Sequence, residues 1–571
     1  MLIKNILEDL NISRNDFFYL FILTVFSILI TYTLMNFNHA IGIYCSDVFV
    51  YLSNSLVFAG YESSRGYLYL SPLICFLTSI LFRLGFLSEM SLYLVTGVFG
   101  IFANIGIYVL LKNKFSSLLS LCGAFLFGSF SLNLLWWANG TLDLPAVALS
   151  VWTVIFTVLA IDKDSKYYMM AIPLFVLAVF TRYTALFLLP LILLYYLSSH
   201  DFFTNLESLI LDRQDFAIKI RSYKKSKEFR NILKSFAIAF VLFLLFSVSI
   251  LALGSHLSFL TQSSTFASGS KGEVIDNAYT NDTFFYLHDF PNFLYSDYVS
   301  IENHIPVLYG FNLISFLLIG LALIGILLFV YKLFKAKREE FSKFKYLALG
   351  LFVLLLFISI LCFKINSIIT ITLLLIDFVI LFSLFKKSGI DRELYSINIL
   401  MLAWFLVYFI FFTFLNIKVN RYIITVFPAF VYFVIYALNE ISEMSKRFNF
   451  LEFKKQNLLK LIPIILIVFC IFSAFAFNST VHYNEHFNKN KVIADYLMEY
   501  DPDFASKDIA VFNQRSYNWF LKGYAIPLTD EQLDYLESSN ITYYISDDNF
   551  DLVNYTMIYQ KEGLYLYERN S

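Results

Sequence analysis

Stretches of about 20 apolar residues recur along most of this chain, and they constrain its fold more than any other feature. A bilayer core of about 30 Å needs roughly 20 such residues per helix, because every backbone N–H and C=O must be hydrogen-bonded within the spanning segments. We therefore predict an all-α polytopic membrane protein with about 13 transmembrane helices. Their expected ranges are 17–36, 91–111, 116–135, 144–161, 167–181, 184–199, 235–254, 309–331, 346–363, 366–385, 394–415, 422–439 and 461–477.

The composition agrees with a membrane protein. Of the 571 residues, 59% are hydrophobic and 15% are charged, against about 45–50% and about 25% in soluble domains. The surplus of apolar surface is expected to face lipid. The formal net charge of −1 gives no electrostatic support for a nucleic acid partner. The five cysteines show neither a CxxC nor a Cys/His spacing typical of a zinc module.

Basic residues indicate how the chain is oriented in the membrane. Clusters of Lys and Arg fall in every second loop between the apolar stretches, and cytoplasmic loops are enriched in these residues. The loop 255–306 instead has one basic residue, Lys271, and six acidic ones, so we expect it outside. The prediction is a multi-pass protein of the cell membrane with a cytoplasmic N-terminus and an extracytoplasmic C-terminus.

One apolar stretch, Leu68–Leu87, is expected not to span the membrane. It contains Pro72 and Arg83, and if it spanned, every later basic cluster would face outside. We interpret it as a helix that lies along or dips into the outer membrane face, within a first external loop at 37–90. The alternative is an ordinary span, with a re-entrant segment elsewhere restoring the orientation of the later loops.

The composition changes after Phe477, where the chain becomes polar and aromatic. We therefore predict a transmembrane domain over 1–477 and a small external α/β domain over 478–571. Helix-like patterns alternate there with short runs typical of strands. The expected helices are 487–500 and 529–538, and the expected strands are 509–512, 541–545, 557–559 and 564–567.

Ionisable residues gather at four places on the predicted outer border of the membrane, namely Asp47, Asp143, Arg182 and the pair Lys418 and Arg421. A charge at that depth is costly unless it is paired, so each is a candidate functional residue. Structural roles are also open: helix caps for the aspartates, a side chain that snorkels to the interface for Arg182, and border anchors for the last pair. Carboxylates beside cations suit a reaction in which a base takes a proton from a hydroxyl while a lipid-linked phosphate departs.

Short motifs surround these residues. They are Asp47-Val48-Phe49-Val50-Tyr51, Ser71-Pro72-Leu73, Asn139-Gly-Thr-Leu-Asp143-Leu-Pro145, Thr181-Arg182 and Arg421-Tyr422-Ile-Ile-Thr425. In this order they resemble motifs of glycosyltransferase superfamily C, in particular the protein O-mannosyltransferases of family 39 and the aminoarabinose transferases. The likeness covers nearly the whole chain. The chain departs from the family pattern at Val48, where the family has Glu, at Arg182, where it has Lys, and at Pro428, where its Pro is displaced.

The resemblance implies an integral membrane glycosyltransferase. Such an enzyme moves a sugar, here mannose or another hexose, from a dolichyl- or undecaprenyl-monophosphate carrier to an extracytoplasmic protein or glycan, with inversion at the sugar carbon. Its partners are that lipid donor, the acceptor and membrane lipid, and no nucleotide cofactor is expected. Two alternatives stay open: an oligosaccharyltransferase, and a lipid-sugar flippase or transporter.

The resemblance also implies roles for individual residues. It makes Asp47 the catalytic base and gives Asp143 the second acidic position. It puts Arg182, Lys418 and Arg421 around the donor phosphate, with Tyr51 and Tyr422 in support. Some relatives bind a divalent metal near the external loops, and here Glu62, His256 and His288 are the candidate ligands.

Overall fold

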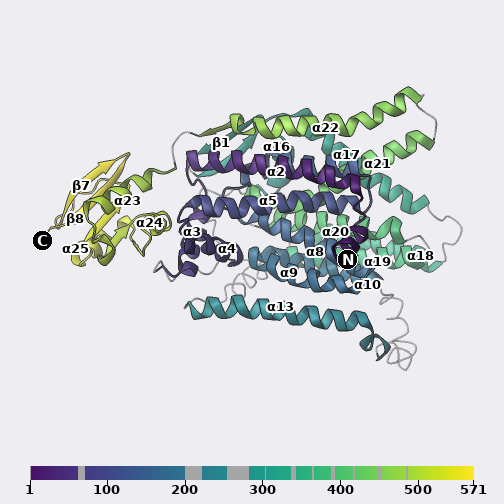
Figure 1. Cartoon of the computed structure of the whole chain (residues 1–571), viewed down its shortest axis with the longest axis horizontal. Coiled ribbons are helices and arrows are strands. Elements are labelled where there is room, and N and C mark those ends of the chain that lie inside the picture. Colours follow the sequence, from purple (N-terminus) through teal and green to yellow (C-terminus); the bar gives the residue numbers. More distant parts are fainter. Residues whose placement is uncertain are drawn as a thin grey trace.

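Long helices lie side by side in the main body of the protein, and a small sheet domain stands at one end of it (Figure 1). The structure is a computed structural model, and it describes residues 2–61, 71–199, 221–253, 282–302, 304–335, 343–362, 366–387, 392–415, 418–447, 453–483 and 487–570.

Every predicted transmembrane segment contains a helix. These helices are α2 Arg14–Ile41, α5 Glu89–Lys112, α6 Ser117–Ser129, α7 Ser131–Trp136, α8 Asp143–Asp162, α9 Tyr168–Thr181, α10 Leu188–Ser199, α13 Lys227–Ala252, α17 Leu313–Lys335, α18 Lys343–Cys362, α19 Ser367–Lys387, α20 Arg392–Phe414, α21 Phe427–Arg447 and α22 Phe453–Thr480. Within the described residues, 8 helices are long and apolar enough to cross a membrane, and the other predicted segments coincide with shorter apolar helices. The chain is thus a multi-pass membrane protein, while the count of 13 spans stays a prediction.

Three of the predicted spans contain backbone that is not α-helical. The segment 116–135 divides at Phe130, whose backbone is extended, into α6 and α7. Two other segments begin with 3-10 turns, η2 (Tyr183–Phe187) before α10 and η3 (Asn420–Val426) before α21. Irregular backbone at membrane depth is tolerated where it is buried in protein or lines a cavity. Such breaks therefore mark a place where the bundle is built around a site.

The segment predicted not to span forms the short helix α4 (Leu73–Arg83), which packs against α3 (Ser46–Ala59). Its 11 residues give a length of roughly 16 Å, about half the thickness of a bilayer core. The guanidinium group of Arg83 donates to the carbonyl oxygen of Phe58 at the end of α3. The two helices form a hairpin at the end of the bundle that carries the sheet domain (Figure 1), as a surface-lying segment requires.

A three-stranded sheet lies beside the same end of the bundle. Strands β1 (Tyr298–Glu302) and β2 (Ile305–Tyr309) form an antiparallel hairpin. Strand β3 (Val481–Tyr483), which directly follows α22, pairs parallel with β1. The sequence predicted only an external loop over 255–306, because a five-residue strand that pairs with a distant three-residue strand carries too weak a periodic pattern.

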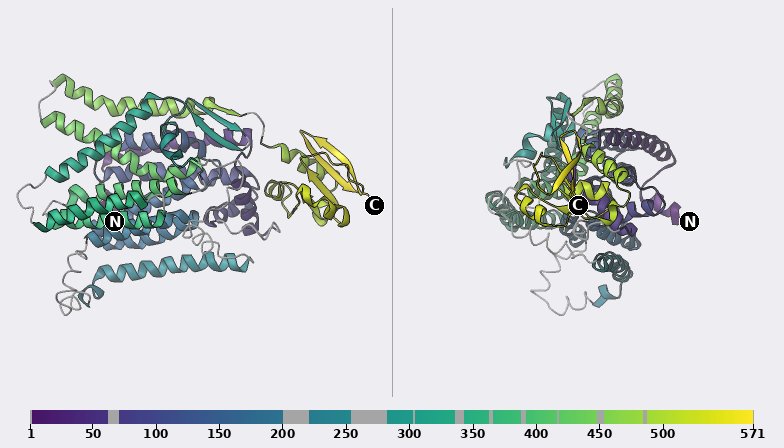
Figure 2. Two further views of the ribbon diagram at one scale, coloured as in Figure 1. Left: turned by 180° about the vertical axis from the view of Figure 1, so that it is seen from behind. Right: turned by 90° about the vertical axis from the view of Figure 1, so that its left-hand side faces the viewer.

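The C-terminal part contains a five-stranded sheet in the order β5-β4-β6-β8-β7. Figure 2 shows it beyond one end of the helices. Its strands are β4 Ile509–Val511, β5 Ile526–Pro527, β6 Tyr543–Ser546, β7 Tyr555–Lys561 and β8 Leu564–Arg569, and its helices are α23 Lys489–Tyr500, α24 Gln514–Phe520 and α25 Leu533–Ser538. Each predicted strand overlaps an observed one. The domain boundary at 477/478 stays a prediction.

Helix α24 attaches the sheet domain to the hairpin of α3 and α4. Phe520 meets Phe49 edge to face with ring centroids 5.5 Å apart, and Trp519 stacks on Phe82 at 5.8 Å. Beside these rings, Arg515 Nη1 donates to Ser46 Oγ at 3.3 Å. The apolar contact therefore ends next to the first turn of α3, where Asp47 lies.

Candidate active site

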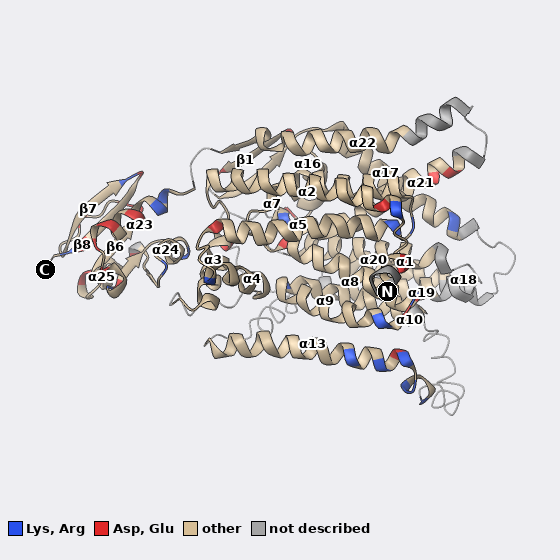
Figure 3. Cartoon of the chain, in the orientation of Figure 1, with Lys and Arg blue, Asp and Glu red and all other residues tan. Residues whose placement is uncertain are grey.

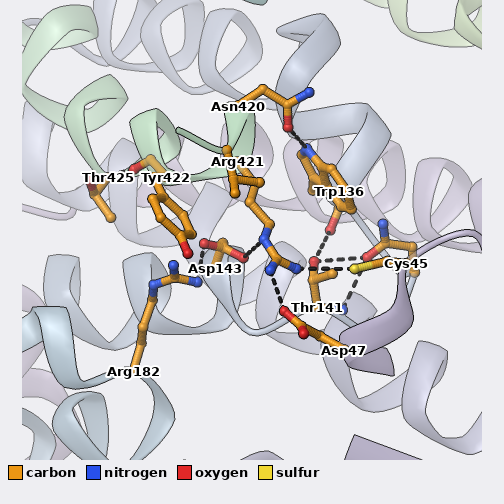
Figure 4. Close-up of polar contacts among 12 residues, drawn as sticks. Cys45, Asp47, Trp136, Thr141, Asp143, Arg182, Asn420, Arg421, Tyr422 and Thr425 are labelled. Atoms are coloured by element: carbon orange, nitrogen blue, oxygen red, sulfur yellow. Dashed lines mark hydrogen bonds and ion pairs between the residues drawn. The ribbon is translucent and has the colours of Figure 1, made fainter. Parts of the chain in front are cut away.

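Four segments that are distant in sequence meet at the end of the bundle nearest the sheet domain. They are the start of α3, the loop between α7 and α8, the junction of α9 with η2, and the first residues of η3. The meeting point brings four of the predicted site residues into one row of alternating charge (Figure 4): Asp47, Arg421, Asp143 and Arg182.

Asp143 lies completely buried between two arginines. Its side chain has 0% exposure; Oδ1 pairs with Arg182 Nη1, and Oδ2 lies 3.6 Å from Arg421 Nε. Neither oxygen accepts a hydrogen bond from a described residue, and the N-cap of α8 is Leu142. The ion pairs, and not a capping role, therefore hold this carboxylate. Two adjacent cations offset the cost of its burial.

Asp47 occupies the open end of the row. Its carboxylate pairs with Arg421 Nη2, and its side chain is 32% exposed against 8% for Arg421. Burial raises the pKa of Asp47, but the charge and hydrogen bond of Arg421 outweigh it and hold that pKa below its usual value. The N-cap of α3 is Cys45, whose Sγ accepts from Arg421 Nη1 at 3.2 Å. Asp47 is therefore ionised and partly exposed, and it is not the cap of α3.

Aromatic rings orient both guanidinium groups. Arg182 lies over the ring of Tyr422 at 4.5 Å, and Arg421 lies 5.6 Å from the ring centroid of Trp136. The indole Nε1 of Trp136 in turn donates to Asn420 Oδ1 at 3.1 Å. Stacking of this kind holds the planar guanidinium group in a fixed orientation. The Arg182 side chain is only 15% exposed and is paired with Asp143, so it does not snorkel to the interface.

The loop before α8 explains how Asp143 reaches this row. Ala138 and Gly140 both have positive φ, 52° and 92°, and the hydroxyl of Thr141 donates to Asn139 Oδ1 at 2.9 Å. A Cβ atom at Gly140 would lie 2.9 Å from Cγ1 of Val48 in α3. The glycine therefore allows the loop to press against α3, which sets the start of α8 beside the first turn of α3.

A cavity of about 780 Å³ opens beside Asp47 and Arg421. Its other walls include Trp136, Lys418 and some of the residues between Asp282 and Tyr309. Within the described residues, its lining includes neither Asp143 nor Arg182. A molecule in the cavity thus meets the Asp47–Arg421 end of the row and does not contact Asp143 or Arg182.

Lys418 has different surroundings from the arginines. Its Nζ donates to the carbonyl oxygens that end α20, to Phe412 at 3.3 Å, to Leu415 at 2.8 Å and also to Thr413. Burial lowers the pKa of Lys418 to about 8. It lines the cavity but caps a helix, so its side chain would have to release carbonyls before it could bind a phosphate.

The remaining predicted residues are two supporting tyrosines and three candidate metal ligands. Tyr51 is buried in α3 one turn beyond Asp47, and Tyr422 carries the stacked Arg182. Glu62 and His256, proposed as metal ligands, lie outside the described residues. His288 pairs through Nδ1 with Asp282 Oδ2 at 2.8 Å. Among the described residues, no three His, Cys, Asp or Glu side chains gather as a metal site.

Three residues of the site had no assigned role in the sequence interpretation: Cys45, Trp136 and Asn420. Their only sequence signal was proximity to a candidate charge, since Cys45 precedes Asp47 by two positions and Asn420 precedes Arg421. Trp136 lies seven positions before Asp143, across a loop whose path is set by tertiary contacts.

Comparison with known proteins shows which proteins this chain resembles. Residues 70–210 match the family model described as dolichyl-phosphate-mannose-protein mannosyltransferase, a range that includes Asp143 and Arg182. No curated protein sequence matches the chain. The family match and the shared fold support the resemblance of the chain to glycosyltransferase superfamily C. Within that superfamily, the chain is similar to the dolichyl-phosphate-mannose-protein mannosyltransferases.

Two solved structures share the fold. ArnT from Cupriavidus metallidurans, bound to undecaprenyl phosphate, aligns with a TM-score of 0.53 and 12% identity over 96% of this chain and 97% of that chain. The apo oligosaccharyltransferase from Archaeoglobus fulgidus aligns with a TM-score of 0.51 and 11% identity over 92% and 69%. These matches agree with the predicted resemblance, and they confirm the coarse prediction of a fold built from many membrane helices.

Proposed function

We propose that this protein transfers one sugar, mannose or another hexose, from a polyprenyl monophosphate to a hydroxyl group of an extracytoplasmic protein or glycan. The observation that carries the proposal is the charged row, which meets the cavity only through Asp47 and Arg421. A carboxylate and a guanidinium side by side match the two needs of the reaction, a base for the acceptor and a cation for the leaving phosphate. The bound undecaprenyl phosphate of the similarly folded ArnT supports a donor of this class.

The reaction is a single displacement. Asp47 takes the proton of the acceptor hydroxyl, whose oxygen forms a bond to the anomeric carbon of the sugar. The bond between that carbon and the phosphate oxygen breaks, and the polyprenyl monophosphate leaves with the electron pair. Arg421 compensates the charge that grows on the phosphate. Attack opposite to the leaving group inverts the anomeric carbon.

Donor binding has to change the pairing of Arg421. In the structure this guanidinium is occupied by Asp47 and Cys45. A phosphate that binds Arg421 competes with Asp47, and a carboxylate released from its cation becomes a stronger base. We infer that the donor binds before the acceptor and that its phosphate frees the base.

Asp143 acts through the two arginines. It holds Arg182 and Arg421 at fixed positions and, completely buried as it is, touches neither the cavity nor its contents. We therefore regard Asp143 as a positioning residue. Arg182, which pairs with it and does not line the cavity either, acts on the donor site through Asp143.

The test is sugar transfer in proteoliposomes. Wild type, Asp47→Asn and the control Asp534→Asn, an exposed residue of α25, receive a radiolabelled polyprenyl-phosphate hexose and envelope extract as acceptor. We expect label in protein or glycan with wild type and the control, and none with folded Asp47→Asn. Transfer of only whole oligosaccharides would favour an oligosaccharyltransferase. Protein-dependent movement of the lipid-sugar across the bilayer without transfer would favour a flippase and overturn the proposal.

A further inference from the structure

A second cavity, of about 590 Å³, lies between α9, α10 and α13. It shares no lining residue with the cavity beside Asp47. Its walls on α9 come from Tyr168 to Val176, toward the start of that helix, whereas Arg182 follows the end of the same helix. The second cavity therefore lies toward the opposite end of the bundle from the candidate active site.

The walls of this cavity are almost entirely hydrocarbon and aromatic. Side chains that line it include Phe175, Ile192, Leu193, Phe236, Phe240 and Phe243. Helix α13 forms one whole side of it and lies at the edge of the helical body (Figure 1). Such a lining has few groups that can form hydrogen bonds, so an apolar chain is the occupant that fits it best.

A basic segment borders the cavity. Residues 221–230, at the start of α13, hold five Lys or Arg and one acidic residue, Glu228. Two members of this segment, Tyr223 and Phe229, line the cavity themselves. Figure 3 shows the Lys and Arg positions, in blue, gathered at this end of α13. The basic segment and the apolar cavity are therefore adjacent, because the same segment contributes to both.

Tyrosine hydroxyls mark the polar edge of the cavity. The hydroxyl groups of Tyr196 and Tyr223 contact each other, and Tyr168 donates to Glu228 Oε1 at 3.1 Å. Tyr side chains concentrate where hydrocarbon meets the head groups of a membrane. Lys227 pairs with Asp164 at 3.2 Å. Four exposed basic residues of the segment are left to face a head group, namely Arg221, Lys224, Lys225 and Arg230.

We propose that this cavity binds one hydrocarbon chain of an anionic glycerophospholipid, whose phosphate head group lies on Lys224, Lys225 and Arg230. Juxtamembrane clusters of Lys and Arg attract anionic lipids, and here the cluster continues directly into a chain-sized apolar cavity. The uncharged far end of a polyprenyl chain would fit the walls but would not account for the basic border. The inference does not depend on the proposed sugar transfer.

The test is native mass spectrometry of the full chain, purified in detergent and offered phosphatidylglycerol or phosphatidylcholine. Ala239→Trp fills the cavity, since Ala239 lines it and is 3% exposed. Val241→Trp is the matched control on the same helix, at a side chain that is 63% exposed. A variant with Lys224, Lys225 and Arg230 all changed to Gln removes three of the four exposed charges, Arg221 being the fourth, and leaves the packing intact.

Wild type and Val241→Trp are expected to retain phosphatidylglycerol in preference to phosphatidylcholine. Both the cavity variant and the charge variant are expected to lose it by about 10-fold or more. Equal retention of the two lipids, or unchanged retention in the charge variant, would overturn the proposal even if Ala239→Trp fails to fold. Displacement of phosphatidylglycerol by an uncharged polyprenol would assign the cavity to the carrier chain instead.

Discussion

The guanidinium group of Arg421 pairs with the carboxylate of Asp47, 374 positions earlier in the chain. The pair borders a cavity of about 780 Å³. On the side away from the cavity, Arg421 also pairs with the buried Asp143. In this arrangement the base and the cation of the proposed reaction neutralise each other until a phosphate arrives. Four predictions follow from the row and its neighbours, each with a measurable outcome.

Asp47→Asn is expected to lower the rate of sugar transfer by about 10²–10⁴-fold, the usual contribution of a positioned base. It is also expected to tighten binding of the polyprenyl monophosphate, because the amide no longer competes for Arg421. Binding of the lipid phosphate to purified protein by isothermal titration measures the second effect. Weaker binding would contradict the displacement of Asp47 by the donor.

Asp143→Asn is expected to destabilise the folded protein by about 3–5 kcal/mol, because two buried guanidinium groups lose their shared counter-charge. The melting temperature of the detergent-solubilised protein reports this loss. Asp47→Asn serves as the comparison, and its effect should be smaller since the Asp47 side chain is 32% exposed. Equal melting temperatures for the two variants would contradict the assignment of Asp143 as the anchor of both arginines.

Arg421→Lys keeps the charge but loses the planar fork that contacts Cys45, Asp47 and Asp143 at once. Charged hydrogen bonds contribute about 1.5–3 kcal/mol each, so kcat/KM for the donor should fall by about 10- to 100-fold. Steady-state kinetics with varied donor concentration measures the change. As a control, Arg569→Lys in the sheet domain should leave the kinetics unaltered.

The lowered pKa of Lys418 is expected to make the free energy of unfolding depend on pH. Its pKa in the folded protein is about 8, lowered from 10.5 by burial. Between these values the unfolded chain binds more protons than the folded protein, so the contribution of Lys418 to the free energy of unfolding rises with pH. From pH 8 to pH 10, this contribution should raise the melting temperature of wild type relative to that of Lys418→Met. An identical pH profile for the two proteins would contradict a lowered pKa.

Much of the fold was predictable because it depends on hydrophobic length. Each predicted span contains a helix, and the 11-residue α4 agrees with Leu68–Leu87 lying outside the span count. Strands β1 and β3 were not predicted as a pair, since they are 182 positions apart in the chain. Local periodicity carries no information about such a partner.

The candidate site was predictable as a set of residues and not as an arrangement. The cost of burying charge in a membrane singled out Asp47, Asp143, Arg182 and Arg421, and all four lie in one row. The same argument put Lys418 among the phosphate ligands, yet its ammonium group caps the end of α20. Both environments satisfy a buried cation, so the sequence could not distinguish between them.

The sequence by itself determined that this chain is a bundle of membrane helices with its polar chemistry at one border, because bilayer thickness and the cost of charge act on local composition. Only the tertiary structure decided which charges meet. The breaks at Phe130, Arg182 and Asn420 and the positive φ of Gly140 bend separate helices to one point. There, ion pairing between residues from four segments selects the order Asp47, Arg421, Asp143, Arg182, since that order alternates the charges and leaves only its first pair open to the cavity.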